Sequence, residues 1–114
     1  MNNDRELLER AAKAAGIEVP KHLWVDYIDT GIKTMSGLVW NPLTDDGHAL
    51  RLAVKLQIEI TTYPKTGEVG AGRSANLVGY GKHGRVFEYF GGDPYEATRR
   101  AIVRAAAEIG KGMK

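Results

Sequence analysis

The spacing of the apolar residues changes once within the segment 40–63, WNPLTDDGHALRLAVKLQIEITTY, and this change limits the possible folds more than any other feature of the chain. As far as Leu56 the apolar residues recur at the spacing of a helix face. From Gln57 they alternate with polar residues, as in a strand. The segment therefore predicts a helix that continues directly into a strand, with Thr44 as the helix cap and Pro64 as the end of the strand.

The predicted helix has a wide apolar face. Its polar stripe is narrow, so we expect other elements to cover most of the helix. The apolar positions are Ala49, Leu50, Leu52, Ala53, Val54 and Leu56, and the polar ones are His48, Arg51 and Lys55.

Two further helices are predicted near the ends of the chain. The first spans residues 3–15 and ends at Gly16, which suits the left-handed position after a helix. The last begins with Asp93 as its cap and Pro94 in its first turn, and Gly110 is expected to end it. Its inward face is predicted to carry Tyr95, Thr98, Ile102, Ala105, Ala106 and Ile109, and its outer face Glu96, Arg100, Arg104, Glu108 and Lys111.

The region between the second and last helices predicts a glycine-rich loop and two more strands. Residues 65–72 are expected to form the loop, and residues 76–80 and 85–90 the strands. The sequence Gly-Lys-His-Gly at 81–84 is typical of a hairpin turn between them. Aromatic residues occur at both odd and even positions of 85–90, and these positions point to opposite faces of a strand. We therefore expect each face of the sheet to carry an aromatic residue.

Residues 17–39 allow two interpretations. Residues 22–28 and 32–39 could form two short strands with a turn at 29–31. They could equally form an irregular excursion held by Trp24 and Trp40. The sequence does not decide between these alternatives.

The order of elements predicts one α+β domain spanning residues 1–114. Residues 40–114 form its α-β-β-β-α core, and residues 1–39 add a helix and the uncertain segment. Short connections between consecutive strands favour an antiparallel meander, which helices must then cover. The expected architecture is a two-layer α/β sandwich with a three-stranded sheet.

Composition excludes several classes of protein. The chain has no cysteine, so it holds no disulfide and no thiolate metal site. Its polar first residues, MNNDRELLER, argue against a signal peptide, and no apolar run is long enough to cross a bilayer. We therefore expect a cytoplasmic protein with no membrane partner. The net charge of +2 is small for a dedicated DNA-binding protein.

Part of the chain resembles a known family. The pattern W-N-P-x-T-D-x-x-x-A-x-x-x-x-x-K-L over residues 40–56 is similar to the segment that opens the phage ABA sandwich domain, and the helix at 97–109 is similar to its end. The resemblance extends from residue 40 onward. It implies a small protein of a bacteriophage or prophage, with an α/β sandwich fold, no established biochemical role and no catalytic residues to carry over.

No catalytic or metal-binding signature is present in the sequence. His22, His48 and His83 lack the spacing of a zinc site, and the sequence has no G-x-S-x-G motif. Two aspartates at 45–46 could meet a cation with His48, but helix capping is the better explanation. The segment GEVGAGR at 67–73 lacks the Lys-Ser/Thr of a phosphate-binding loop and is expected to form a mobile hairpin loop. We predict no enzyme activity, metal or cofactor.

Two functional hypotheses follow. The first is a protein-interaction module that binds a host or phage protein, or forms a homo-oligomer, through an open sheet edge or Trp24. The second is weak, salt-dependent binding of nucleic acid by basic residues around the strand loops. The candidate binding residues for this second function are Arg73, Lys82, His83 and Arg85.

Overall fold

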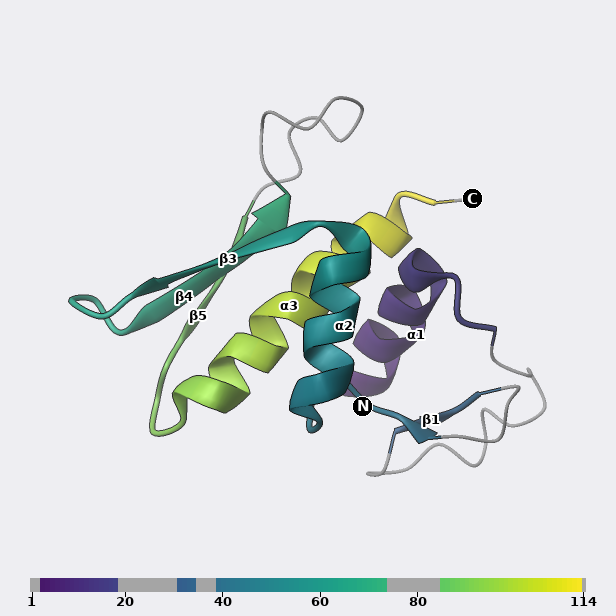
Figure 1. Ribbon diagram of the computed structural model, residues 1–114, viewed down its shortest axis with the longest axis horizontal. Coiled ribbons are helices and arrows are strands. Elements are labelled where there is room, and N and C mark those ends of the chain that lie inside the picture. Colours follow the sequence, from purple (N-terminus) through teal and green to yellow (C-terminus); the bar gives the residue numbers. More distant parts are fainter. Residues whose placement is uncertain (1–2, 19–30, 35–38, 74–84, 114) are drawn as a thin grey trace.

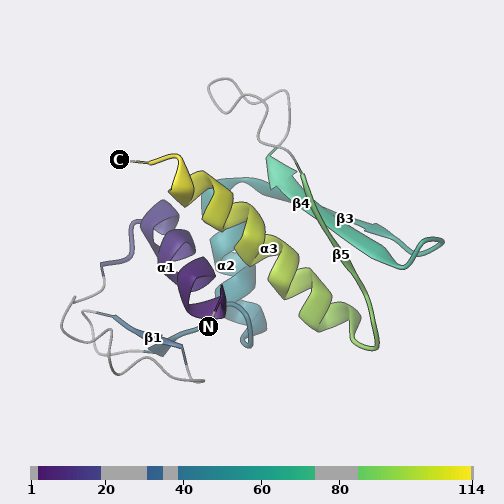
Figure 2. The same cartoon turned by 180° about the vertical axis from the view of Figure 1, so that it is seen from behind.

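A computed structural model describes residues 3–18, 31–34, 39–73 and 85–113. Figures 1 and 2 show the helices together on one side of a three-stranded antiparallel sheet, so the predicted α+β class and order of elements are confirmed. The elements are α1 (Asn3–Ala15), β1 (Ile32–Lys33), β2 (Val39–Trp40), α2 (Asp46–Leu56), β3 (Ile58–Tyr63), β4 (Glu68–Arg73), β5 (Val86–Tyr89) and α3 (Pro94–Lys111).

The helix-to-strand junction lies where the spacing of apolar residues changes. Gln57 adopts the left-handed conformation, with φ 58°, and its backbone N–H bonds back to the last turn of α2. The cap at the other end of α2 is Asp45, not Thr44 as predicted. The Asp45 side chain accepts a hydrogen bond from the backbone N–H of His48, and this bond lowers the pKa of the Asp45 carboxyl.

The covering of α2 is less complete than the sequence predicts. Four of its apolar residues, Ala49, Leu52, Ala53 and Leu56, are buried. Leu50 and Val54, which were assigned to the same face, are 60% and 70% exposed. Helix α2 packs mainly against α3 and makes smaller contacts with α1 and β3, and these contacts leave Leu50 and Val54 exposed.

Strand β4 differs most from the structure predicted for its sequence. Residues 65–72 were predicted to form a loop, but residues 68–73 are the central strand of the sheet. Val69 and Ala71 alternate along this strand and are fully buried. The second strand predicted at 76–80 and the turn at 81–84 lie outside the described residues, whereas the strand predicted at 85–90 is confirmed as β5.

Helix α3 is the centre of the fold, because it lies on the sheet and also contacts α1 and α2. Asp93 caps it as predicted, but the helix continues past Gly110 to Lys111. Gly110 packs so closely against α1 that a Cβ atom at this position would overlap the carbonyl oxygen of Arg10. Gly110 is therefore a contact residue and not a helix terminator.

The two faces predicted for α3 need two corrections. Tyr95, predicted to face inward, is 71% exposed, and Ala97 and Ala101 are buried in its stead. The spacing of four residues from Glu96 and Glu108 would allow Arg100 and Arg104 to pair within α3 itself. Instead Arg100 pairs with Asp4 of α1 and Arg104 with Glu88 of β5.

A small second sheet precedes α2. Its strands pair Ile32 with Trp40 and Lys33 with Val39. Residues 32–33 and 39–40 therefore belong to two paired strands, and not to the single strand 32–39 that one interpretation assumed. The other half of that proposed hairpin, 22–28, lies outside the described residues.

Candidate functional site

Among the described residues, no helix covers one face of the three-stranded sheet, as Figures 1 and 2 show. In β4 the buried residues Val69 and Ala71 point toward α3, so Gly70 and Gly72 point the opposite way. The registers of β3 and β5 place Tyr63, Phe87 and Tyr89 on this opposite side. We call this surface the aromatic face, and it consists of Glu59, Thr61, Tyr63, Glu68, Gly70, Gly72, Arg85, Phe87 and Tyr89.

The aromatic rings rest on the glycines of β4. The ring centroids of Tyr63 and Phe87 lie 6.1 Å apart with their planes tilted by 43°. A Cβ atom on Gly70, between them, would lie 2.9 Å from Cε1 of Phe87 and 3.4 Å from the Tyr63 ring. Glycine thus lets the two rings meet above the central strand. Tyr63, Phe87 and Tyr89 are nevertheless 39%, 48% and 76% exposed.

Arg85 lies flat across the same face. Its Nη2 donates to the Thr61 hydroxyl at 2.9 Å and to the Gly70 carbonyl oxygen at 3.4 Å. Nη1 approaches the Glu59 carboxylate at 3.5 Å. Its Cγ would be 3.0 Å from a Cβ atom at Gly72, so the arginine stem replaces a side chain of the central strand. These contacts fix the guanidinium among the three strands.

The predicted binding residues do not gather into one basic patch in the described part of the chain. Arg73 lies on the helix side of the sheet, where its Nε donates to the Leu56 carbonyl oxygen at 2.8 Å. Arg85 lies on the opposite side, within the aromatic face. Trp24, Lys82 and His83 lie outside the described residues. The aromatics of β5 are evident in the sequence, but their association with Tyr63 is not, because only the strand register brings these rings together.

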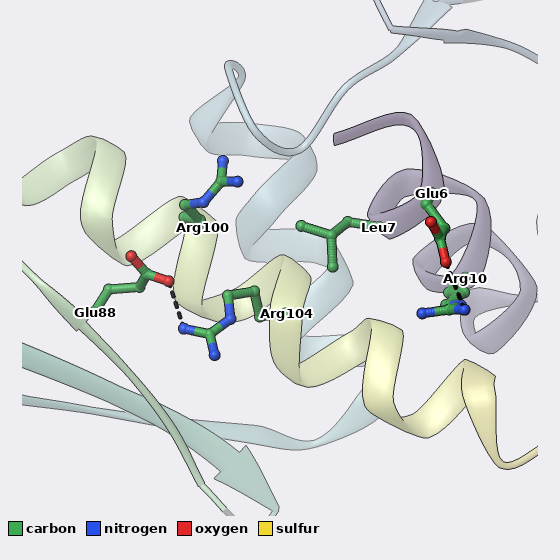
Figure 3. A pocket seen from close by; sticks show the side chains of 6 residues that line it. All are labelled: Glu6, Leu7, Arg10, Glu88, Arg100 and Arg104. Atoms are coloured by element: carbon green, nitrogen blue, oxygen red, sulfur yellow. Dashed lines mark hydrogen bonds and ion pairs between the residues drawn. The ribbon is translucent and has the colours of Figure 1, made fainter. Parts of the chain in front are cut away.

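A second site is a concave one, and it is lined mainly by charged residues (Figure 3). It is a cavity of about 340 Å³ between α1, α3 and β5, and Leu7 points into it. Arg10 pairs with Glu6 at 2.6 Å, Arg104 with Glu88 at 2.5 Å, and Arg100 with Asp4 at 2.8 Å. Because each arginine here already has a carboxylate partner, the cluster joins the three elements and offers little net charge to an anionic ligand. Its lining is Glu6, Leu7, Arg10, Glu88, Arg100 and Arg104.

The chemistry of the described residues offers no metal centre. Within the described ranges, no three His, Cys, Asp or Glu side chains are placed to hold a metal ion. Asp45 caps α2, and Nδ1 of His48 accepts a hydrogen bond from the backbone N–H of Asn41 at 3.0 Å. Both groups therefore serve the start of this helix. None of the helices in the described ranges is long and apolar enough to cross a membrane.

Comparison with protein-family models, with curated proteins and with solved structures finds no match for this chain. The resemblance of residues 40–56 and 97–109 to the phage ABA sandwich domain therefore stays a prediction. The aromatic face is thus the candidate site on the strength of its own geometry.

Proposed function

We propose that this protein is a non-catalytic interaction module, of bacteriophage or prophage origin, that binds a host or phage protein through the aromatic face. The observation that supports this function best is the group of exposed rings, with Arg85 beside Phe87, on a sheet face that no helix of the described residues covers. Tyrosine and arginine are enriched among the residues that dominate binding energy at protein interfaces. Contiguous exposed apolar surface is also typical of such interfaces.

The rigidity of this surface favours the same function. Phe87 is supported by the backbone of Gly70, and Arg85 is held by hydrogen bonds to Thr61 and to Gly70. A partner would find these side chains already ordered, so little conformational entropy would be lost on binding. A surface with mobile side chains would bind more weakly for the same area.

Nucleic acid is a less suitable ligand for this face. Rings on a sheet can stack on unpaired bases, but such sites also need a positive groove for the phosphates. Here Arg85 lies beside the Glu59 carboxylate, which offsets its charge. Arg73 lies on the other side of the sheet and donates a hydrogen bond to the Leu56 carbonyl oxygen. The prediction of weak nucleic-acid binding is kept as an outcome of the following experiment.

The test is retention of proteins from a nuclease-treated bacterial lysate on the tagged full chain. We expect a discrete protein to bind the wild type, and Tyr89→Ser and Phe87→Ser to reduce its retention about tenfold or more, the loss typical of central interface residues. Val54→Ser is the matched control, because Val54 is 70% exposed on α2, away from the aromatic face. Equal retention by all variants, or retained material that disappears with nuclease, would contradict the proposal.

A further inference from the structure

The outer edge of β3 is unusual for an exposed strand. Among the described residues, the sheet order β3-β4-β5 gives this strand one pairing partner, β4. Every residue of β3 except Ile58 is exposed. Its sequence, IEITTY, has high strand propensity and contains no lysine, proline or bulge of the kind that usually protects an edge. The edge is therefore a ready template for another strand.

The opposite edge of the sheet is protected. Strand β5 is shorter, and Arg104 of α3 donates to the Phe87 carbonyl oxygen at 3.0 Å while pairing with Glu88. A side chain from the helix layer thus occupies part of the edge of β5. Because the edge of β5 is partly occupied and the edge of β3 is open, a further strand is expected to pair with β3.

We propose that two copies of this chain pair through the outer edges of β3, antiparallel and around a twofold axis, to form a continuous six-stranded sheet. This proposal concerns an edge of the sheet and does not rest on the function proposed for its face. The twofold axis keeps both helix layers on the same side. It also keeps both aromatic faces together on the other side.

The sequence of β3 selects one register for this pairing. A register centred on Glu59 would set two carboxylates directly opposite each other, which is unfavourable. A register centred on Thr61 is also less favourable, because it would place the apolar Ile60 opposite the polar Thr62. A register centred on Ile60 instead places the two Ile60 side chains together and sets Glu59 opposite Thr61 of the second copy, so it joins apolar with apolar and avoids the charge repulsion.

Charge complementarity favours a second copy as the occupant over an unrelated strand. Nη2 of Arg85 lies 2.9 Å from the Thr61 hydroxyl, whereas its contact with Glu59 of the same chain is long, at 3.5 Å. In the register centred on Ile60, Glu59 of the second copy faces Thr61 and hence the guanidinium beside it. The twofold axis creates this Arg85–Glu59 pair twice.

An apolar groove beside β3 would be covered by the same contact. Ile60 forms its wall together with Leu50 of α2 and with Tyr95 and Ile102 of α3, around a volume of about 210 Å³. Leu50 and Tyr95 are 60% and 71% exposed in the single chain. The Ile60 side chain of the second copy would extend this apolar wall across the twofold axis and shield it from water.

Cysteine crosslinking tests the register directly, because the chain contains no cysteine of its own. We expect Ile60→Cys to form a disulfide with itself under mild oxidation, since residues opposite each other across strands lie within disulfide distance. Glu59→Cys should crosslink with Thr61→Cys in a mixture faster than with itself. Glu9→Cys on α1 measures random collision, and equal rates at all these positions would overturn the proposal.

The mass in solution, measured by sedimentation over a range of concentrations, tests whether the pairing is real. We expect the wild-type chain to dimerise. Glu59→Lys should raise the dimer Kd about tenfold or more, because it sets two cations beside each Arg85. This side chain is exposed, so the variant should fold, as circular dichroism will check. A wild-type monomer at concentrations up to about 1 mM, or an unchanged Kd in Glu59→Lys, would overturn the proposal.

Discussion

The two faces of β4 use small residues for different purposes. On the helix side, Val69 and Ala71 are fully buried and allow α3 to lie close to the sheet. On the other side, Gly70 and Gly72 have no side chain. The space above them is occupied by Phe87 of β5 and by Arg85, the residue before β5. The helix side therefore provides stability through close packing, whereas the aromatic face presents rigid side chains to solvent.

The largest effect is expected in the helix layer, at the crossing of α3 and α1. Gly110→Ala would overlap the backbone of Arg10, which cannot move without moving α1. We expect a loss of about 3 kcal/mol in the free energy of unfolding, at the upper end of the effect of overpacking. Denaturant unfolding measures it. Gly112→Ala is the control, because its Cβ atom would be 3.7 Å from its nearest neighbour. Equal stability of the two variants would show that the helices can separate freely.

A smaller effect is expected on the covered face of the sheet. Val69→Ala removes two buried methyl groups beneath α3, where little relaxation is possible. We expect a loss of about 2 kcal/mol in the free energy of unfolding, because the deletion leaves a cavity as well as losing burial. Val54→Ala, which removes the same atoms from an exposed site, should change stability by less than about 0.5 kcal/mol. Similar losses at both positions would contradict the assigned burial.

Gly70→Ala sharpens the comparison, because Gly70 is the neighbour of Val69 on the opposite face. Its Cβ atom would approach the end of the half-exposed Phe87 ring, which can rotate away, and not a backbone atom. We therefore expect a loss of only about 1 kcal/mol or less in stability. The Tyr63–Phe87 contact should be disturbed more clearly, as a changed near-ultraviolet circular dichroism spectrum. A loss as large as that of Gly110→Ala would mean that the aromatic face is packed as tightly as the helix layer.

The sequence predicts the helices and two of the three strands of the main sheet because their signals are local. The change of spacing at Gln57 and the cap at Asp93 depend only on neighbouring residues. The third strand, β4, was missed because its glycines resemble those of a loop. Its alternation of Val69 and Ala71 carried the strand signal, but the reason for the glycines lies in residues of another strand.

The candidate site was predictable only in part. The alternation of Phe87 and Tyr89 places these two rings on one face of β5. That Tyr63 joins these two rings depends on the register across β4. Arg85 was interpreted as part of a basic loop, because its partners on β3 are distant in sequence. The role of Gly110 was missed for the same reason, since its contact is with α1. Non-local pairing is the information that a single sequence lacks.

The smallest effect on stability is expected at Tyr89, the most exposed ring of the aromatic face. Tyr89→Ser removes few contacts in the folded chain, so we expect the free energy of unfolding to change by less than about 0.5 kcal/mol. Thermal and denaturant unfolding, compared with Val54→Ser, measure this change. A loss near that of Val69→Ala would show that the ring belongs to the core of the single chain. An unchanged stability combined with lost partner binding would separate the two faces fully, because a side chain that contributes nothing to folding would then contribute to recognition.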